Sequence, residues 1–287
     1  MATTFTNQAA LSYNGGTVMS NIAVGVIEGN LTVSKESIAQ SYRVGDRITY
    51  VVSIVNSGDS AISGLTVTDD LGAYSFEQTS VQPLTYADGS VQYYVDGVLQ
   101  AAPAVSTADG LQFSDITVPA NGNTMLIYEA TVNEFASPED GAEIINTVTV
   151  NGAAISAVTD SATISVKSAP ELNIIKTIAP IPVAENGEIT YTLRLENSGN
   201  TALTAADNAV ISDTFDPILG NISVTLNDEP LIVKSGYAYD EVTGLFTTVA
   251  GLVEVPAATF TQDSVTGAYS TTPGIATLVV TGTITGE

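Results

Sequence analysis

The residues that could do chemistry in this chain form one set that is repeated in part. Lys35, Asp69 and Asn146 make up the first set, and Lys176 and Asp213 occupy matching places in a second segment of similar sequence. Side chains of a β-strand alternate between its two faces. Each of these five residues is spaced by two or four positions from apolar residues and therefore shares a strand face with them. We expect all five to point into an apolar core.

A lysine, an aspartate and an asparagine inside a core predict a specific reaction. Burying a charge costs several kcal/mol, so burial favours the neutral amine and the neutral carboxylic acid. A neutral amine is a nucleophile, and a protonated carboxyl group can polarise an amide and carry protons. The product would be a Lys–Asn isopeptide bond, with loss of ammonia. The residues leave one alternative open, a buried ion pair that forms no covalent bond.

Composition excludes most other chemistry. The chain has no His and no Cys, which removes the commonest general base, thiol nucleophiles, disulfides and most transition-metal sites. We therefore expect no cofactor, no metal and no enzymatic turnover beyond autocatalytic isopeptide formation. Acidic clusters at 69–70 and 207–216 contain no complete calcium motif, so solvating charge is the simpler interpretation.

Charge and hydropathy patterning indicate a β-rich protein that does not bind nucleic acid. Seven Lys+Arg against 31 Asp+Glu give a net charge of -24, which leaves no basic patch for phosphate backbones or anionic lipid. Hydrophobic residues make up 44% of 287 residues, in short alternating runs that are typical of strands. We expect no membrane span, and no signal peptide is visible in the segment from Met1 to Tyr13.

An internal repeat sets the domain plan. The segment LTVSKESIAQSYRVGDRITYVVSIVNSG from Leu31 matches LNIIKTIAPIPVAENGEITYTLRLENSG from Leu172 without a gap. The match continues from VTDDL to ISDTF, and later from MLIYEATVNE to TLVVTGTITGE. The first copy then runs on through IINTVTVNGAAISAVTDSATISV, which predicts two further strands. The second copy has no counterpart of these strands.

The counterpart lies at the other end of the chain. Residues 6–26 resemble residues 145–166, with Asn7 at the place of Asn146. Because a sandwich without a terminal strand exposes an unpaired edge, another segment must fill it. We therefore expect a donor-strand segment at 1–27, a complete domain at 28–168 and an incomplete acceptor domain at 169–287. The donor residues predicted to point inward beside Asn7 are Phe5, Ala9 and Leu11.

The pattern K-x(14)-Y with NSG and VTDDLG, closed by INTVTV, resembles a known family. It is similar to the conserved-repeat domains of bacterial and archaeal surface proteins, known as domain of unknown function eleven. It also resembles the A-type immunoglobulin-like domains of collagen adhesins and pilins. The resemblance implies an all-β fold of two tandem immunoglobulin-like β-sandwich domains. It further implies that Lys35 is the nucleophile, Asn146 the acceptor and Asp69 the catalyst of an intramolecular bond.

The same resemblance extends to the second copy. There Lys176 and Asp213 match the pattern as nucleophile and catalyst, but the acceptor is absent and only Asn7 can replace it. We therefore expect an intermolecular bond between Lys176 and Asn7 of a neighbouring subunit, with Asp213 as catalyst. A donor segment at one end and an acceptor at the other make a head-to-tail contact, which propagates as a fibre. We therefore expect a homopolymer, a pilus-like or spore-appendage-like filament at an extracellular surface, with itself as partner.

Two alternatives remain open from the sequence. In the first, the N-terminal strands complete the second domain of their own molecule, which gives a monomeric adhesin or stalk module. In the second, loops bind a carbohydrate or a host protein through exposed tyrosines, for which ordinary strand packing is the simpler interpretation. The tyrosines concerned are Tyr74, Tyr86, Tyr93, Tyr94 and Tyr237.

Overall fold

The computed structural model describes residues 3–27, 29–108, 110–153 and 155–284. The chain divides into two compact units. Unit 1 consists of Met1–Ser137 and Ala142–Val166, and unit 2 of Pro138–Gly141 and Lys167–Glu287. The regular structure of the described residues is strand throughout, apart from one 3-10 helix, η1 (Ala205–Asp207). The all-β prediction is confirmed.

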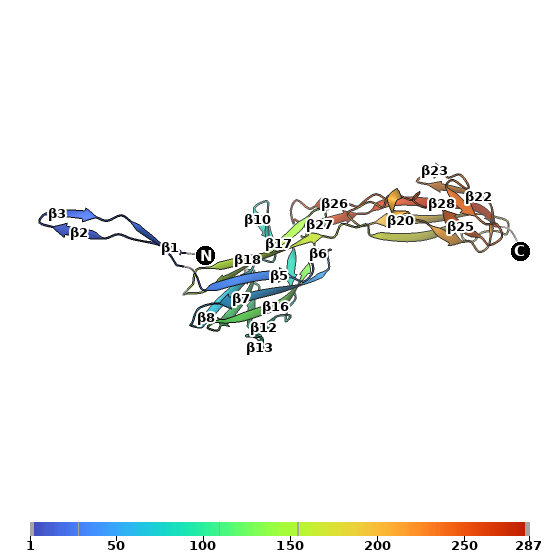
Figure 1. Ribbon diagram of the computed structural model, residues 1–287. Coiled ribbons are helices and arrows are strands. Elements are labelled where there is room, and N and C mark those ends of the chain that lie inside the picture. The colour runs from blue at the N-terminus through green and yellow to red at the C-terminus, as the bar shows by residue number, and fades with distance from the viewer. Residues whose placement is uncertain (1–2, 28, 109, 154, 285–287) are drawn as a thin grey trace. The chain divides into compact units, whose positions relative to one another are not determined.

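The first sheet of unit 1 contains the strand of Lys35 at its edge. Its order is β13-β12-β16-β7-β5, and β11 also pairs with β16 (Figure 1). Its central strands alternate strictly between buried and less buried residues, as expected for a sheet with one face on a core. The strands are β5 (Leu31–Ser37), β7 (Arg47–Asn56), β11 (Leu84–Tyr86), β12 (Gln92–Val95), β13 (Val98–Leu99) and β16 (Gly122–Val132).

The second sheet of unit 1 carries Asp69 and Asn146. Its order is β14-β15-β8-β17-β18-β6, so β8 is paired on both sides. Residues of both sheets form one apolar core, which makes unit 1 a β-sandwich. The strands are β6 (Ser41–Tyr42), β8 (Ile62–Asp69), β14 (Ala104–Ser106), β15 (Leu111–Val118), β17 (Glu143–Asn151) and β18 (Val158–Val166), and a small hairpin is made of β9 (Tyr74–Phe76) and β10 (Thr79–Val81).

The N-terminal segment folds as a hairpin (Figure 1). Its outer pair is β1 with β4, and its inner pair is β2 with β3. Almost all of its described side chains are exposed, including the apolar ones. The four strands are β1 (Thr3–Asn7), β2 (Ala10–Tyr13), β3 (Gly16–Met19) and β4 (Ala23–Ile27).

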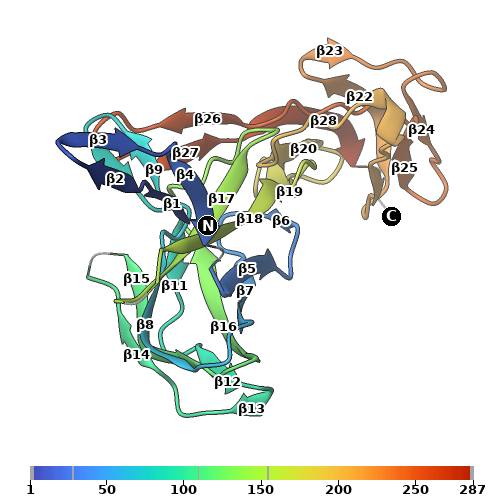
Figure 2. The same cartoon turned by 60° about the vertical axis from the view of Figure 1, so that its left-hand side comes forward.

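Unit 2 repeats the sandwich with a smaller second sheet. Its first sheet has the order β19-β20-β28-β22-β23 and its second the order β21-β25-β24, with one apolar core between them. A separate hairpin joins β26 to β27 (Figure 2). The strands are β19 (Leu172–Ala179), β20 (Glu188–Asn197), β21 (Ser212–Thr214), β22 (Leu219–Leu226), β23 (Glu229–Pro230), β24 (Tyr237–Tyr239), β25 (Leu245–Thr248), β26 (Thr259–Gln262), β27 (Tyr269–Thr272) and β28 (Gly274–Ile284).

The two units share a register as well as an order of strands. Lys35 of β5 pairs with Val52 of β7, and Lys176 of β19 pairs with Leu193 of β20, each 141 positions further on. The tandem repeat of the sandwich is thereby confirmed. A helix long and apolar enough to cross a bilayer is absent from the described residues.

The Asn-Ser-Gly turns close one end of each unit. Asn56 is buried, and its amide nitrogen donates to the carbonyl oxygens of Ser60 and Pro119, both at 2.9 Å. Asn197 does the same in unit 2, where it reaches Pro256 at 3.0 Å. These asparagines are therefore structural.

Candidate functional site

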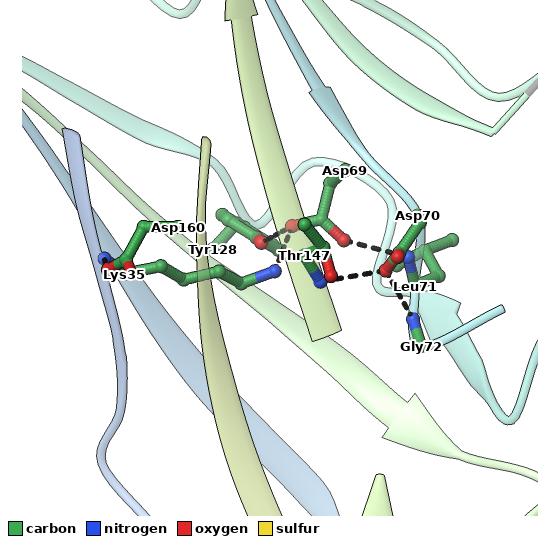
Figure 3. Close-up of polar contacts among 8 residues, drawn as sticks. All are labelled: Lys35, Asp69, Asp70, Leu71, Gly72, Tyr128, Thr147 and Asp160. Carbon is green, nitrogen blue, oxygen red and sulfur yellow. Dashed lines mark hydrogen bonds and ion pairs between the residues drawn. The ribbon is translucent and has the colours of Figure 1, made fainter. Parts of the chain in front are cut away.

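Unit 1 holds Lys35 and Asp69 as a fully buried pair. The Lys35 Nζ lies 2.5 Å from the Asp69 Oδ2, and both side chains are 0% exposed. The Tyr128 hydroxyl donates to the same oxygen, and the backbone N–H of Leu71 donates to Oδ1 at 2.9 Å (Figure 3). The carboxyl group is thus held on both oxygens, with its amine partner beside it.

The surroundings of this pair favour a neutral amine. The Lys35 Nζ lies 4.9 Å from the centroid of the Tyr50 ring. Burial lowers the pKa of Lys35, and the negative charge of Asp69 opposes that effect. Burial likewise raises the pKa of Tyr50 and of Tyr128. Both phenols therefore stay protonated, and Tyr128 can remain a donor to Asp69.

Asn146 is buried in the same core without a hydrogen bond. Its strand β17 pairs with β8, where Val148 lies opposite Asp69. Asn146 adjoins the hydroxyl groups of Tyr50 and Tyr128. Neither atom of its amide, however, makes a hydrogen bond of good geometry among the described residues, although both hydroxyl groups lie within reach. An unsatisfied buried amide costs about 1–3 kcal/mol, so the position calls for an explanation other than stability.

Two further aspartates, Asp160 and Asp70, hold β17 and β18 in place, and for Asp70 this corrects the interpretation of the 69–70 cluster as solvating charge. The backbone N–H of Lys35 donates to the Asp160 Oδ2 at 2.7 Å, which ties β18 to β5. The Asp70 Oδ1 accepts from the backbone N–H groups of Thr147 at 2.8 Å and Gly72 at 2.9 Å (Figure 3). Asp70 faces away from Asp69, as strand parity predicts, so only the pairing of β8 with β17 reveals its function.

Unit 2 contains the equivalent ion pair, but its lysine side chain is exposed to solvent. Lys176 and Asp213 are in contact, and the Lys176 Nζ lies 4.8 Å from the centroid of the Tyr191 ring and 5.4 Å from that of Phe215. The Lys176 side chain is nevertheless 42% exposed, whereas that of Lys35 is 0% exposed. The amine of unit 2 has its predicted partner but still faces solvent.

Apolar residues beside Lys176 share this exposure. We call the inward side of β19 the open face of unit 2, formed by Leu172, Ile174, Lys176 and Ile178. Leu172 is 48% exposed, whereas its counterpart Leu31 is 4% exposed. Among the described strands, β19 pairs only with β20, and β21 only with β25. In the described part of unit 2, no strand is therefore paired at the places that β17 and β18 occupy in unit 1.

The second copy also differs in the groups around its carboxylate. Val280 stands at the place of Tyr128, and Phe215 at that of Leu71, by the alignment of the repeats. Asp213 therefore lacks the phenol donor that Asp69 has. Burial raises the pKa of Tyr191, and Asp213 adds to the effect.

The N-terminal hairpin has the register of the β17–β18 pair. Asn146 lies opposite Ala162, and Asn7 lies opposite Ala23. Of the predicted donor residues, Phe5 lies in β1, Ala9 between β1 and β2, and Leu11 in β2, and all three are exposed. The hairpin thus carries its asparagine and apolar side chains on the surface.

The tyrosines considered as ligand contacts have structural partners. Tyr86, Tyr93 and Tyr237 are buried. The Tyr74 hydroxyl donates to the carbonyl oxygen of Phe135 at 2.7 Å, and that of Tyr94 to the Gln92 side chain at 2.9 Å. Strand packing and local hydrogen bonds account for all five.

Comparisons with known proteins give distant structural similarities. No protein-family model matches the chain, and no curated protein matches it. The pilus backbone RrgB of Streptococcus pneumoniae is similar with 13% identity and a TM-score of 0.35, over 85% of this chain and 55% of that one, so this chain spans little more than half its length.

Two further solved structures are comparable. The major pilin subunit BcpA of Bacillus cereus has 11% identity and a TM-score of 0.36, over 94% of this chain and 73% of that one. The collagen-binding subdomain of the Enterococcus faecalis surface protein ACE has 12% identity and a TM-score of 0.30, over 49% of this chain and 98% of that one. At TM-scores of this size, no function carries over from these proteins.

Proposed function

We propose that this protein is the structural subunit of a self-assembling extracellular filament, pilus-like or spore-appendage-like. The N-terminal hairpin of one copy completes unit 2 of the next copy, on the open face. The observation that carries this proposal is the contrast between Lys35, which is buried beneath β17 and β18, and Lys176, which has the same ion pair but is 42% exposed. The protein has no catalytic turnover in this role.

Both surfaces that the proposal joins are apolar and exposed in the single chain. Leu172, Ile174 and Ile178 lie bare on the open face, and Phe5 and Leu11 lie bare on the hairpin. Contiguous exposed apolar side chains commonly mark an interaction surface. The strand edges add backbone donors and acceptors that a new strand can pair. Each surface thus provides apolar side chains and strand edges that the other can bury and pair.

The shared register supports a second copy's hairpin as the occupant. The pairs Asn7–Ala23 and Asn146–Ala162 are equivalent, so the hairpin can take the place of β17 and β18 in unit 2. Asn7 then enters the core beside Lys176 and Asp213. Because each copy donates at one end and accepts at the other, the contact does not close and a linear polymer results.

We further propose that docking is followed by a covalent bond. The Lys176 Nζ attacks the Cγ of Asn7 from the neighbouring copy, and the new C–N bond replaces the Cγ–Nδ2 bond. The proton from the amine passes through Asp213 to the departing nitrogen, which leaves as ammonia. Lys35, Asn146 and Asp69 carry out the same reaction within unit 1. No oxidant and no metal takes part.

Deletion of residues 1–27 tests the filament directly. Among the described residues, the strands of this segment pair only with one another, so the deletion leaves the sheets of both units intact. The full chain is expected to form fibres by electron microscopy, and the deleted chain to elute as a monomer in size-exclusion chromatography. Fibres from the deleted chain, or a compact monomer from the full chain, would overturn the proposal.

The covalent step has its own control. Asn7→Ala should still form fibres, but boiled denaturing gels should show monomers in place of ladders. Asn14→Ala, at the turn of the same hairpin, should keep the ladders. Ladders that persist in Asn7→Ala would contradict the assignment of the acceptor.

A further inference from the structure

On the face that carries Asn7, the N-terminal hairpin differs from the β17–β18 pair at one cross-strand pair of residues. In unit 1, Ile144 and Ile164 lie opposite each other and both are buried in the core. At the equivalent place in the hairpin, Phe5 lies opposite Gly25. A large aromatic residue and a glycine have replaced two branched aliphatic residues.

The Phe5 ring occupies the space that a side chain at position 25 would need. A Cβ built on Gly25 would lie 2.3 Å from the Phe5 Cζ, well inside van der Waals contact. The ring therefore lies over Gly25 of β4, and a side chain at position 25 would make the ring turn away from this place. Phe5 covers the position that glycine leaves empty.

A third change accompanies these two on the acceptor side. Ser37 of β5 is 9% exposed, and its counterpart on the open face of unit 2 is Ile178, which is 39% exposed. In unit 1 the Lys35 N–H binds Asp160, and the N–H of Ser165 binds the carbonyl oxygen of Gln40. Both hydrogen bonds join residues 125 positions apart, and the same offset matches Ser37 to Ala162, two residues before Ile164. A small residue there faces a large one.

We propose that Phe5 and Gly25 of one copy pack with Ile178 of a second copy as one layer, and that this layer makes the hairpin specific for unit 2. The inference rests on the proposed function. The layer of Ser37, Ile144 and Ile164 has nearly the same total volume, redistributed among the three positions, and volume-conserving exchanges are the ones that cores tolerate. The β17–β18 pattern would overfill unit 2 at Ile178.

A double-mutant cycle tests this layer. All arms carry Asn7→Ala, so that fibres are held without a covalent bond and subunit dissociation can be timed by light scattering after dilution. The hairpin variant is Phe5→Ile with Gly25→Ile, which rebuilds the pair of unit 1. The acceptor variant is Ile178→Ser. Val24→Thr is the matched control, because Val24 corresponds to the exposed Thr163 and faces outward.

Each variant alone should dissociate about 10- to 100-fold faster than the reference, from overpacking in one case and a void in the other. The two combined should return to within about threefold of the reference, and Val24→Thr should match it. Rescue also shows that the hairpin variant folds. Additive losses, or no loss in the single variants, would overturn the layer and leave the filament standing. If the unsubstituted full chain forms no fibres either, the proposed function itself fails.

Discussion

Units 1 and 2 place the same lysine, aspartate and tyrosine on the same strands, yet one set is sealed and the other faces solvent. Lys35 is covered by β17 and β18, which follow it in the chain, whereas the described part of unit 2 pairs no strand at the edges of β19 and β21. The difference teaches that closure of the core, rather than the polar set itself, decides whether the lysine is buried or exposed to solvent. Under the proposed function, the same difference separates an internal bond in unit 1 from an intermolecular bond in unit 2.

Closing unit 2 within its own chain should have the largest effect on this comparison. Val132 and Ile284 end equivalent strands, so a copy of residues 133–142 followed by residues 4–27 can be appended after residue 284, with the original 1–27 deleted. We expect a monomer that forms no fibres and has a higher Tm for unit 2, because the open face is filled. Size-exclusion chromatography and calorimetry measure both. Fibres from this chain would show that filling the open face of unit 2 does not prevent polymerisation.

The two lysines should differ in their contribution to stability. In a chain without residues 1–27 that also carries Asn146→Ala, so that unit 1 forms no covalent bond, Lys35→Ala should lower the free energy of unfolding of unit 1 by about 3–5 kcal/mol, because it leaves Asp69 buried and unpaired. Lys176→Ala should cost less than about 1 kcal/mol in unit 2, because solvent screens the exposed pair. Urea unfolding resolves the two transitions. Equal losses would show that exposure does not distinguish the units.

A substitution at Asn146 tests whether unit 1 contains a covalent bond or only an ion pair. If unit 1 forms the covalent bond, the chain has lost the mass of one ammonia, and Asn146→Ala both restores that mass and lowers stability. Closing a loop on the order of 100 residues stabilises by about 4–5 kcal/mol. If Lys35 and Asp69 form only an ion pair, Asn146→Ala removes an amide without hydrogen bonds. The free energy of unfolding then changes by less than about 1 kcal/mol. Asn151→Ala, at the exposed end of β17, is the control for intact mass and unfolding.

Strand parity and the internal repeat predict much of this structure, because both are local properties of the sequence. They place Lys35, Asp69 and Asn146 in one core, and they match Asn7 to Asn146. Tyr128 could have been found by parity, since it alternates with buried Leu126 in the same strand. Its absence from the second copy, at Val280, concealed it.

Other features depend on which strands become neighbours, and no local pattern contains that information. Asp160 and Asp70 act on strands far from their own in sequence. The match of Phe5 with Gly25 depends on the hairpin register, and the exposure of Ile178 depends on what does not cover β19.

A chain with one bare hairpin and one open face leaves the same two surfaces at the ends of any polymer it builds. Every addition is then the same bimolecular step, with no special nucleus to assemble first. Without the covalent step, growth of this kind is isodesmic, so the mean filament length of the Asn7→Ala chain should rise smoothly with subunit concentration and show no lag. Capping would need only a molecule that offers one of the two surfaces without the other.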